Sequence, residues 1–296
     1  MTGQPGRWAL ILHGGAKEIK PEEEEDNRTG CLQALAAGTR VLERGGSAID
    51  AVEASIRVLE ALPVFNAGLG SALNAAGEVE MCAALMDGKT LEVGAVGAVM
   101  GVRHPVSVAR KILPEEPILL VGEGAYDFAR EHHAELCDPH ALIVEKRKES
   151  LEALHDTVGA VALDVNGNLA AGTSTGGLTG ALKGRMGDSA MPGCGYYADN
   201  NIGAVALSGQ GEGIARIATA AQIMAAMDRD GPEAAIAKAL SQMKRVGGDG
   251  GGIAIGRQGR IGWWHNSPHF AVAMTASDMG GAKVWLNKQE DTNRDG

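Results

Sequence analysis

The chain has 296 residues, of which 45% are hydrophobic, so it is long enough for one large domain or two small ones with a sizeable core. Its formal net charge of −10 argues against nucleic acid or an anionic membrane as a partner. The first residues show neither a long apolar run nor a signal-peptide pattern, so a cytoplasmic location is expected. Neither a zinc site nor a disulfide framework is indicated, because the four cysteines lie far apart, at Cys31, Cys82, Cys137 and Cys194.

The first half of the chain predicts short strands and paired helices. The apolar run Trp8–Leu12 predicts a buried strand that enters a tight turn at residues 13–16. Ser47 is expected to cap the second of two successive helices, which ends before Pro63. Helices are expected at 31–42, 47–62, 106–113 and 124–135, and strands at 78–86, 91–100 and 118–121.

The second half continues this alternation after a charged stretch. Residues 139–152 are charged and irregular, and we expect 139–156 to form a mobile linker. Paired helices that alternate with paired strands predict layers with helices outside and sheets inside, and therefore an α+β fold. The remaining strands are expected at 158–163, 169–175, 202–208, 253–255, 261–264 and 270–274, and the remaining helices at 214–227 and 232–246, with a frayed tail after Lys288.

The stretch from His155 to Ser189 organises the chain, and it begins with a hairpin. A three-residue loop, Val165-Asn166-Gly167, with Gly167 in the left-handed third position, would pair Asp164 with Asn168. Counting along that ladder places Thr175 opposite Thr157 on the same face. A two-residue Asn-Gly turn would shift the register by one and turn Thr175 to the other face. We favour the three-residue loop because glycine suits its last position.

Thr157 is a candidate nucleophile. A threonine within a chain is a poor nucleophile, but one that becomes an N-terminus carries its own base, an α-amine whose pKa is near ~8. Taken alone, Thr157 is better explained as a β-branched residue that begins a strand. The neighbouring sequence changes this interpretation.

The segments HDTVGAVALD, GTSTGG and GRMGDS resemble those of the plant-type asparaginase and isoaspartyl peptidase family of N-terminal-nucleophile hydrolases. The resemblance extends over nearly the whole chain in the same order, through ILHGGA, FNAGLGS, ALMDGKTLEVGAVGAV, SGQGEG and GGDGGGIAI. It implies a four-layer αββα sandwich formed by a single domain, 1–296. It also implies self-cleavage between Asp156 and Thr157, which gives an α subunit 1–156 and a β subunit 157–296, and a homodimer of such αβ units.

The resemblance further implies an activity and the roles of individual residues. The enzyme would hydrolyse L-asparagine to L-aspartate and ammonia and cleave β-aspartyl dipeptides, without a cofactor for catalysis. Thr157 would attack the substrate amide, and Thr175 would orient its hydroxyl, with Asn66 of the FNAG loop reaching the same region. Ser208, where the family usually has threonine, and Gly209 would form the oxyanion hole. Gly211 would let the backbone approach the substrate, and Gly209 would also be a substrate-binding residue.

Arg185 and Asp188 form a candidate clamp for an amino acid. A guanidinium can bind an α-carboxylate through two parallel hydrogen bonds, and a carboxylate three residues later can hold an α-ammonium. An isolated Arg/Asp pair in a loop is more often a surface ion pair, but its place in the family motif reverses that preference. The resemblance also implies a structural sodium ion bound by backbone carbonyls of Leu59, Glu60, Leu62, Phe65, Ala67 and Leu69.

Two alternatives remain open from the sequence. Many family members have glycine before the threonine, whereas His155-Asp156 is the arrangement of the related glycosylasparaginases, which act on glycosylated asparagine. GTSTGG and the ILHGGA opening favour the asparaginase and isoaspartyl peptidase type. A non-catalytic amino-acid binder on the same fold is the second alternative, and the presence of Thr157, Thr175, Arg185 and Asp188 argues against it.

Overall fold

The computed structural model describes residues 6–144 and 156–292, which form two β-sheets and a set of helices. The larger sheet has eight strands in the order β12-β11-β1-β5-β6-β2-β3-β4, and the smaller has four in the order β10-β9-β8-β7. The strands of the larger sheet are β1 (Ala9–Lys17), β2 (Met81–Asp87), β3 (Val93–Val99), β4 (Leu119–Val121), β5 (Val158–Leu163), β6 (Leu169–Thr175), β11 (His269–Ala276) and β12 (Lys283–Trp285). Those of the smaller sheet are β7 (Tyr196–Asp199), β8 (Gly203–Gly209), β9 (Gly250–Gly256) and β10 (Ile261–His265).

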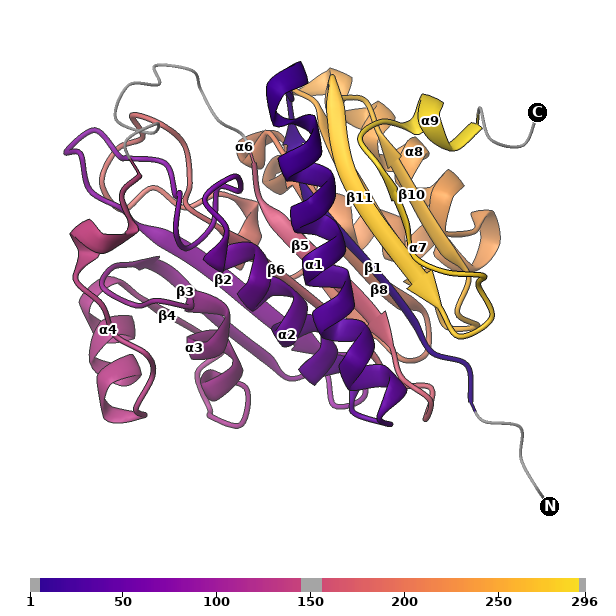
Figure 1. Cartoon of the computed structure of the whole chain (residues 1–296), viewed down its shortest axis with the longest axis horizontal. Coiled ribbons are helices and arrows are strands. Elements are labelled where there is room, and N and C mark those ends of the chain that lie inside the picture. The colour runs from indigo at the N-terminus through magenta and orange to yellow at the C-terminus, as the bar shows by residue number, and fades with distance from the viewer. Residues whose placement is uncertain (1–5, 145–155, 293–296) are drawn as a thin grey trace.

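The helices pack against both sheets. In Figure 1, α1 and α2 cross in front of the strands of the larger sheet, and α3 and α4 lie near its β3–β4 edge. Helices α7 and α8 contact β8, β9 and β10 of the smaller sheet. The helices are α1 (Glu24–Glu43), α2 (Ala48–Ala61), α3 (Pro105–Ile112), α4 (Gly122–Glu131), α6 (Gly211–Arg216), α7 (Thr219–Asp230), α8 (Pro232–Gln242) and α9 (Lys288–Thr292). None of the helices in the described part of the chain combines the length and the apolar character that a membrane span requires.

Alternating side chains of the central strands divide the core into separate clusters. On β1, Leu10 and Leu12 pack with the helix side, whereas Ile11 belongs to the cluster between the two sheets. On β8, Val205 and Leu207 pack with α7 and α8. Successive strand residues point to opposite faces, so both faces of each sheet are covered in this region.

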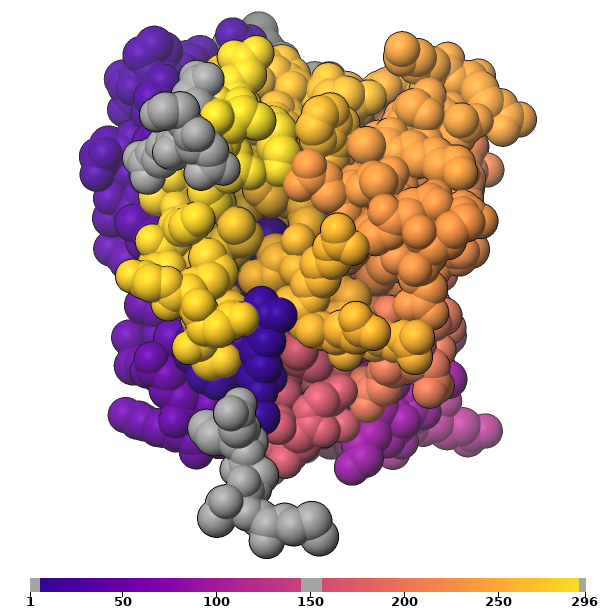
Figure 2. Space-filling view, turned by 90° about the vertical axis from the view of Figure 1, so that its right-hand side faces the viewer, coloured from indigo at the N-terminus to yellow at the C-terminus, as the bar shows by residue number. Residues whose placement is uncertain are grey.

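The first and last parts of the chain meet in the larger sheet. Strand β1 pairs antiparallel with β11 on one side and with β5 on the other. Figure 2 shows the indigo start of the chain between the yellow C-terminal segments and the pink middle segments. Strand β5, which follows Thr157 directly, therefore lies in the middle of the sheet.

The hairpin predicted around Asn166-Gly167 is confirmed. Asp164 N–H donates to the carbonyl of Asn168 over 2.9 Å, and Gly167 has a φ of +82°, which a glycine adopts without steric cost. The β5–β6 ladder pairs Val158 with Ser174, and the same register sets Thr157 opposite Thr175. The capping role of Ser47 is also confirmed, because its side chain accepts a hydrogen bond from Asp50 N–H.

Several element boundaries differ from the sequence predictions. The expected turn at 13–16 is instead a bulge within β1, where the register against β11 shifts between His13 and Ala16. The single helix expected over 214–227 is divided into α6 and α7, because Ala218 adopts the left-handed conformation at φ +49°. Strands β7 and β12 were not predicted. The tail expected to fray after Lys288 begins with α9, Lys288–Thr292.

The linker predicted over 139–156 is only partly described. Pro139–Leu142 forms a 3-10 helix whose start is capped by the side chain of Asp138, and Leu142 is buried. The irregular structure expected at the start of this segment is therefore wrong. Residues 145–155 lie outside the described part of the chain, and Asp156 is described and buried.

Candidate active site

Thr157 stands immediately before β5, at the centre of a cluster of buried polar groups. Its backbone N–H donates a 3.0 Å hydrogen bond to Ser208 Oγ of β8, which also accepts one from Ala16 N–H of β1, again over 3.0 Å. Ser208 is fully buried, and Thr157 is 6% exposed. One hydroxyl thus joins three strands from the two sheets at the nucleophile predicted from the sequence.

The hydroxyl of Thr157 faces a serine that the sequence reasoning did not single out. Thr157 Oγ1 lies 3.4 Å from Ser189 Oγ, and the carbonyl of Ser189 accepts a 2.7 Å hydrogen bond from Thr173 Oγ1. Thr175 Oγ1 instead accepts a hydrogen bond from Gly177 N–H over 3.1 Å. Within residues 6–144 and 156–292, the expected hydrogen bond between Thr157 and Thr175 is not formed. Ser189 lies directly after Asp188 in the GRMGDS motif, which was the available signal.

Asn66 holds the FNAG loop against the end of β6. Its Oδ1 accepts a 2.7 Å hydrogen bond from Ala72 N–H, and its Nδ2 donates to the carbonyl of Gly177 over 2.8 Å. Gly176 N–H donates to the Asn66 carbonyl over 2.8 Å. These bonds place Asn66 beside the segment that follows Thr175, with both side-chain polar atoms engaged by the backbone.

The Arg185 guanidinium is bound to Glu212, for which the sequence predicted no role. Its Nε donates to Glu212 Oε1 over 2.9 Å and its Nη2 to Oε2 over 2.7 Å. Glu212 is the acidic residue of SGQGEG, at the start of α6. This two-point contact fixes the plane of the guanidinium and occupies one of its two-donor edges. A Cβ at Gly187 would lie 3.2 Å from both Nη1 and Nη2.

Asp188 is a buried carboxyl beside that guanidinium. It is 2% exposed, and its Oδ2 has no hydrogen-bond partner among the described residues. Burial raises the pKa of Asp188 to about 7, although its backbone amide and the charge of Arg185 oppose the shift. An unpartnered carboxylate oxygen in such a setting can accept a hydrogen bond from a cationic ligand.

Glycines bring the backbone close to these groups. A Cβ at Gly211 would lie 2.8 Å from Asp188 Oδ1 and 3.2 Å from Arg185 Nη2, so a side chain there would fill the space beside the predicted clamp. At Gly209, with a φ of +145°, a Cβ would lie 2.4 Å from the carbonyl oxygen of Asp249. Gly209 therefore requires glycine because of the surrounding backbone, whereas a side chain at Gly211 would displace the predicted clamp.

The bulge of β1 brings two further ionisable side chains to the site. Lys17 Nζ lies 2.7 Å from Asp156 Oδ2, with both side chains almost fully buried. His13 is fully buried, with its ring centroid 5.0 Å from that of Phe270. Burial lowers the pKa of His13 to about 3, against a smaller opposing influence of the nearby Thr157 backbone, so the imidazole is neutral at physiological pH. Neither Lys17 nor His13 was predicted from the sequence to lie at the site.

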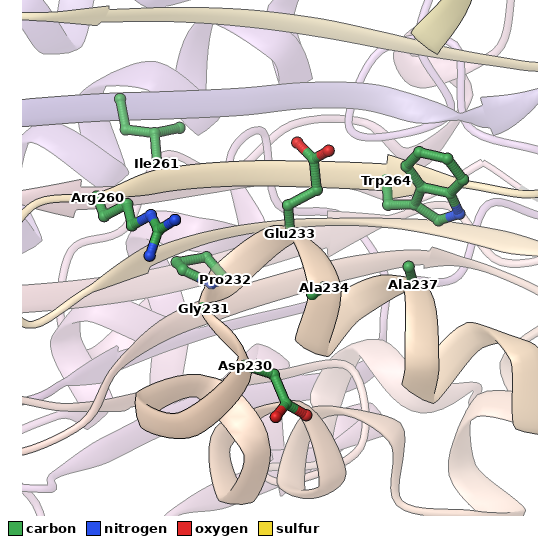
Figure 3. A pocket seen from close by; sticks show the side chains of 9 residues that line it. All are labelled: Asp230, Gly231, Pro232, Glu233, Ala234, Ala237, Arg260, Ile261 and Trp264. Carbon is green, nitrogen blue, oxygen red and sulfur yellow. The ribbon is translucent and has the colours of Figure 1, made fainter.

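A separate cavity of about 470 Å³ lies between the start of α8 and β10 (Figure 3). None of its lining residues belongs to the predicted site. It is lined by Asp230, Gly231, Pro232, Glu233, Ala234, Ala237, Arg260, Ile261 and Trp264.

Comparison with known proteins identifies the family of the chain. The family model described as "Asparaginase" matches residues 6–156 and 146–283. The chain belongs to this asparaginase family. It is 41% identical over 267 residues to a Danio rerio protein named isoaspartyl peptidase/L-asparaginase, with 84% of this chain and 86% of that protein covered. A Xenopus laevis protein of the same name is 42% identical over 266 residues, with the same coverage, and a Homo sapiens one is 40% identical over 268 residues, covering 84% and 87%.

The structure brings most of the residues that the resemblance to the asparaginase family implied into one region. Thr157, Ser208 and Ala16 meet through Ser208 Oγ, and Arg185, Asp188 and Gly211 lie against one another. Thr173 and Thr157 are connected through Ser189. The two groups adjoin because Asp188 and Ser189 are consecutive residues of one 3-10 helix, Asp188–Ala190. Within the described part of the chain, no cluster of three or more His, Cys, Asp or Glu side chains could hold a metal ion.

Proposed function

We propose that this chain is a self-processing threonine amidohydrolase that hydrolyses L-asparagine to L-aspartate and ammonia and cleaves β-aspartyl dipeptides. The observation that carries the proposal is the position of Thr157. Its backbone nitrogen is held by Ser208, and its hydroxyl lies beside the serine that follows Asp188. The names of the relatives, isoaspartyl peptidase/L-asparaginase, support the same substrates.

Maturation would begin with attack of Thr157 Oγ1 on the carbonyl carbon of Asp156. A C–O bond forms, the C–N bond breaks, and the hydroxyl proton passes to the nitrogen, which becomes the α-amine of Thr157. Water then hydrolyses the ester, leaving a carboxylate on Asp156 and the free hydroxyl on Thr157. The products are an α subunit 1–156 and a β subunit 157–296. Because Thr157 is almost fully buried in the uncut chain, cleavage would also open the site to substrate.

Turnover would use the amine that cleavage creates. With a pKa near ~8, this amine can take the proton of the Thr157 hydroxyl as the oxygen attacks the substrate amide. Ammonia or an amino acid leaves, and water hydrolyses the acyl-enzyme. Ser208 Oγ accepts two N–H hydrogen bonds, so its own O–H can be donated to the developing oxyanion together with the N–H of Gly209. Thr175, opposite Thr157 in the ladder, would orient the nucleophile after the cut, with Asn66 supporting the end of its strand.

The substrate would be held by its amino-acid end. Arg185, fixed by Glu212, would bind the α-carboxylate, and Asp188 Oδ2 would accept a hydrogen bond from the α-ammonium. Gly211 would leave the space for the substrate beside both side chains. This arrangement selects ligands that carry both charges of a free aspartyl group.

We further propose the four-layer αββα arrangement of this family and a homodimer of cleaved αβ units. The layering is supported by the separate clusters of core residues on the two faces of each sheet. The cytoplasmic location expected from the sequence remains a prediction.

We also propose that a structural sodium ion binds at the end of α2 and in the loop that follows it. Backbone oxygens already crowd the two glycines there, because a Cβ at Gly68 would lie 2.3 Å from the Glu60 carbonyl oxygen and one at Gly70 would lie 3.0 Å from that of Phe65. Carbonyl oxygens of this kind suit a hard cation. The ion would be held by the carbonyls of Leu59, Glu60, Leu62, Phe65, Ala67 and Leu69, and it would supply no chemistry to the reaction.

A second candidate function is hydrolysis of glycosylated asparagine, favoured by Asp156 in the position before Thr157. Turnover rates on β-aspartyl-leucine, L-asparagine and a glycosylated asparagine test the ranking. We expect the first two substrates to be turned over faster. Faster turnover of the glycosylated asparagine would make its hydrolysis the preferred function. An uncut chain that binds asparagine without turnover would identify a non-catalytic binder.

A further inference from the structure

A buried ion pair lies directly before the proposed cleavage point. Lys17 Nζ is 2.7 Å from Asp156 Oδ2, and the two side chains are 7% and 0% exposed. Among the described residues, neither Asp156 carboxylate oxygen receives a hydrogen bond of aligned geometry, so the contact is one of charge. Removal of one partner from such a pair leaves an uncompensated buried charge, and the remaining side chain must then move or draw in water.

Lys17 is itself held at a defined place. It ends β1 just after the bulge between His13 and Ala16, and such bulges redirect the side chains that follow them. Its Nζ also donates a 3.1 Å hydrogen bond to the carbonyl of Val64. Gly15, with a φ of +111°, lies against Asp156, where a Cβ would approach the Asp156 Cβ to 2.8 Å. The Asp156 side chain is thus enclosed by the bulge.

The same bulge holds the residue on the other side of the scissile bond. Ala16 N–H and Thr157 N–H both donate to Ser208 Oγ over 3.0 Å. Lys17 therefore fixes the residue that provides the carbonyl, while its neighbour Ala16 shares a hydroxyl with the residue that provides the nitrogen. Two consecutive residues of β1 therefore position the two sides of the Asp156–Thr157 peptide bond. Lys17 does so through its ion pair with Asp156, and Ala16 does so through the Ser208 hydroxyl that it shares with Thr157.

We propose that Lys17 is a positioning residue for self-cleavage, which acts through the Asp156 side chain to present the Asp156 carbonyl to Thr157 Oγ1. This inference rests on the proposed self-processing. We expect the effect of Lys17 to be on the cleavage step, because its ion pair is with Asp156 and the Asp156–Thr157 bond no longer exists in the mature enzyme.

The test compares the rate of self-cleavage of freshly purified full-length chains, followed by denaturing gel and intact mass. Lys17→Met is expected to cleave at least about tenfold more slowly than the wild type. Lys89→Met, which alters an exposed lysine in a turn, is the matched control and should cleave at the wild-type rate. Circular dichroism and thermal unfolding establish that each variant is folded.

A second pair of variants separates positioning from general support of the fold. In an Asp156→Gly background, Lys17 has no carboxylate to hold, so adding Lys17→Met should change the remaining cleavage rate by less than about twofold. If Lys17→Met slows cleavage equally in both backgrounds, or leaves the wild-type background unaffected, the inference is wrong. If the wild-type chain itself stays uncut, the proposed self-processing fails first.

Discussion

The backbone nitrogen of Thr157 and the side-chain oxygen of Ser208 lie 3.0 Å apart, and this hydrogen bond links the residue before β5 of the larger sheet to β8 of the smaller sheet. This contact involves an atom that takes part in both proposed reactions, self-cleavage and substrate turnover. In the uncut chain, the nitrogen belongs to the peptide bond that would be broken, and in the proposed mature enzyme it is the α-amine that serves as the base. One serine therefore positions the same atom in both reactions.

Replacement of Ser208 by alanine tests how much the hydrogen bonds to its hydroxyl contribute to stability. Two buried N–H groups, of Ala16 and Thr157, would lose their acceptor, at a cost of about 1–3 kcal/mol each. Urea unfolding, measured in a Thr157→Ala background so that every chain is uncut, should show a lower unfolding free energy. Ser241→Ala, at an exposed serine, should change it by less than about 0.5 kcal/mol. Equal stability of Ser208→Ala and its parent would show that water replaces the hydroxyl without cost.

The buried carboxyl of Asp188 predicts a pH-dependent stability. Its pKa is raised from 3.8 to about 7, so the folded protein keeps a proton that the unfolded chain loses. The unfolding free energy contributed by this group therefore falls as the pH rises from about 4 to about 7. Asp188→Asn removes that titration, so its stability relative to the wild type should increase across this window and become constant above it. Parallel stability curves for the two proteins would contradict the assignment.

Substrate binding should follow the same ionisation. If Asp188 holds the α-ammonium as a carboxylate, the KM for L-asparagine rises as the pH falls below about 7, by up to about tenfold per pH unit. In Asp188→Asn, the KM should be high throughout and insensitive to pH over that range. Steady-state kinetics of fully cleaved enzyme between pH 5.5 and 8.5, on the order of half-unit steps, measure this. A wild-type KM that is flat across pH 7 would exclude the ionised form as the ligand of the ammonium.

The pairing of Arg185 with Glu212 predicts that a substitution of Glu212 changes KM but not kcat. Glu212→Gln keeps the shape but weakens a two-point charged contact that is partly exposed, for which a loss of about 1 kcal/mol is expected. The KM should rise by about fivefold while kcat stays within about twofold, because Arg185 is proposed to bind the α-carboxylate of the substrate and not the amide that reacts. Glu233→Gln, which breaks a similar pair with Lys288 outside the site, is the control. A fall in kcat with unchanged KM would place Glu212 in the chemical step.

The sequence was sufficient where local chemistry decides the structure. The Asn166-Gly167 turn needs a residue with positive φ at a single position, and this fixed the register that sets Thr175 opposite Thr157. The cap at Ser47 is likewise a contact between residues three apart. Such features depend on neighbours along the chain, so they can be predicted without knowledge of the fold.

The features that the sequence did not predict depend on contacts between distant parts of the chain. The glycines after His13 suggested a turn, but pairing of β1 with strands on both sides keeps the segment extended with a bulge. Lys17 meets Asp156 across 139 residues of sequence, and the partner of Arg185 lies 27 residues away. No local pattern marks these pairs, and Ala218, which divides the helix predicted over 214–227, is an ordinary helix former whose left-handed backbone has no sequence signal.

The central claim is that Thr157 becomes an N-terminus and then acts as the nucleophile. Intact mass spectrometry of the purified, active protein tests it most directly, alongside the Thr157→Ala variant as an uncut and inactive control. The account predicts two polypeptides whose masses correspond to 1–156 and 157–296, with the second beginning at Thr157. An active protein that remains in one piece, or whose second polypeptide begins at another residue, would contradict it.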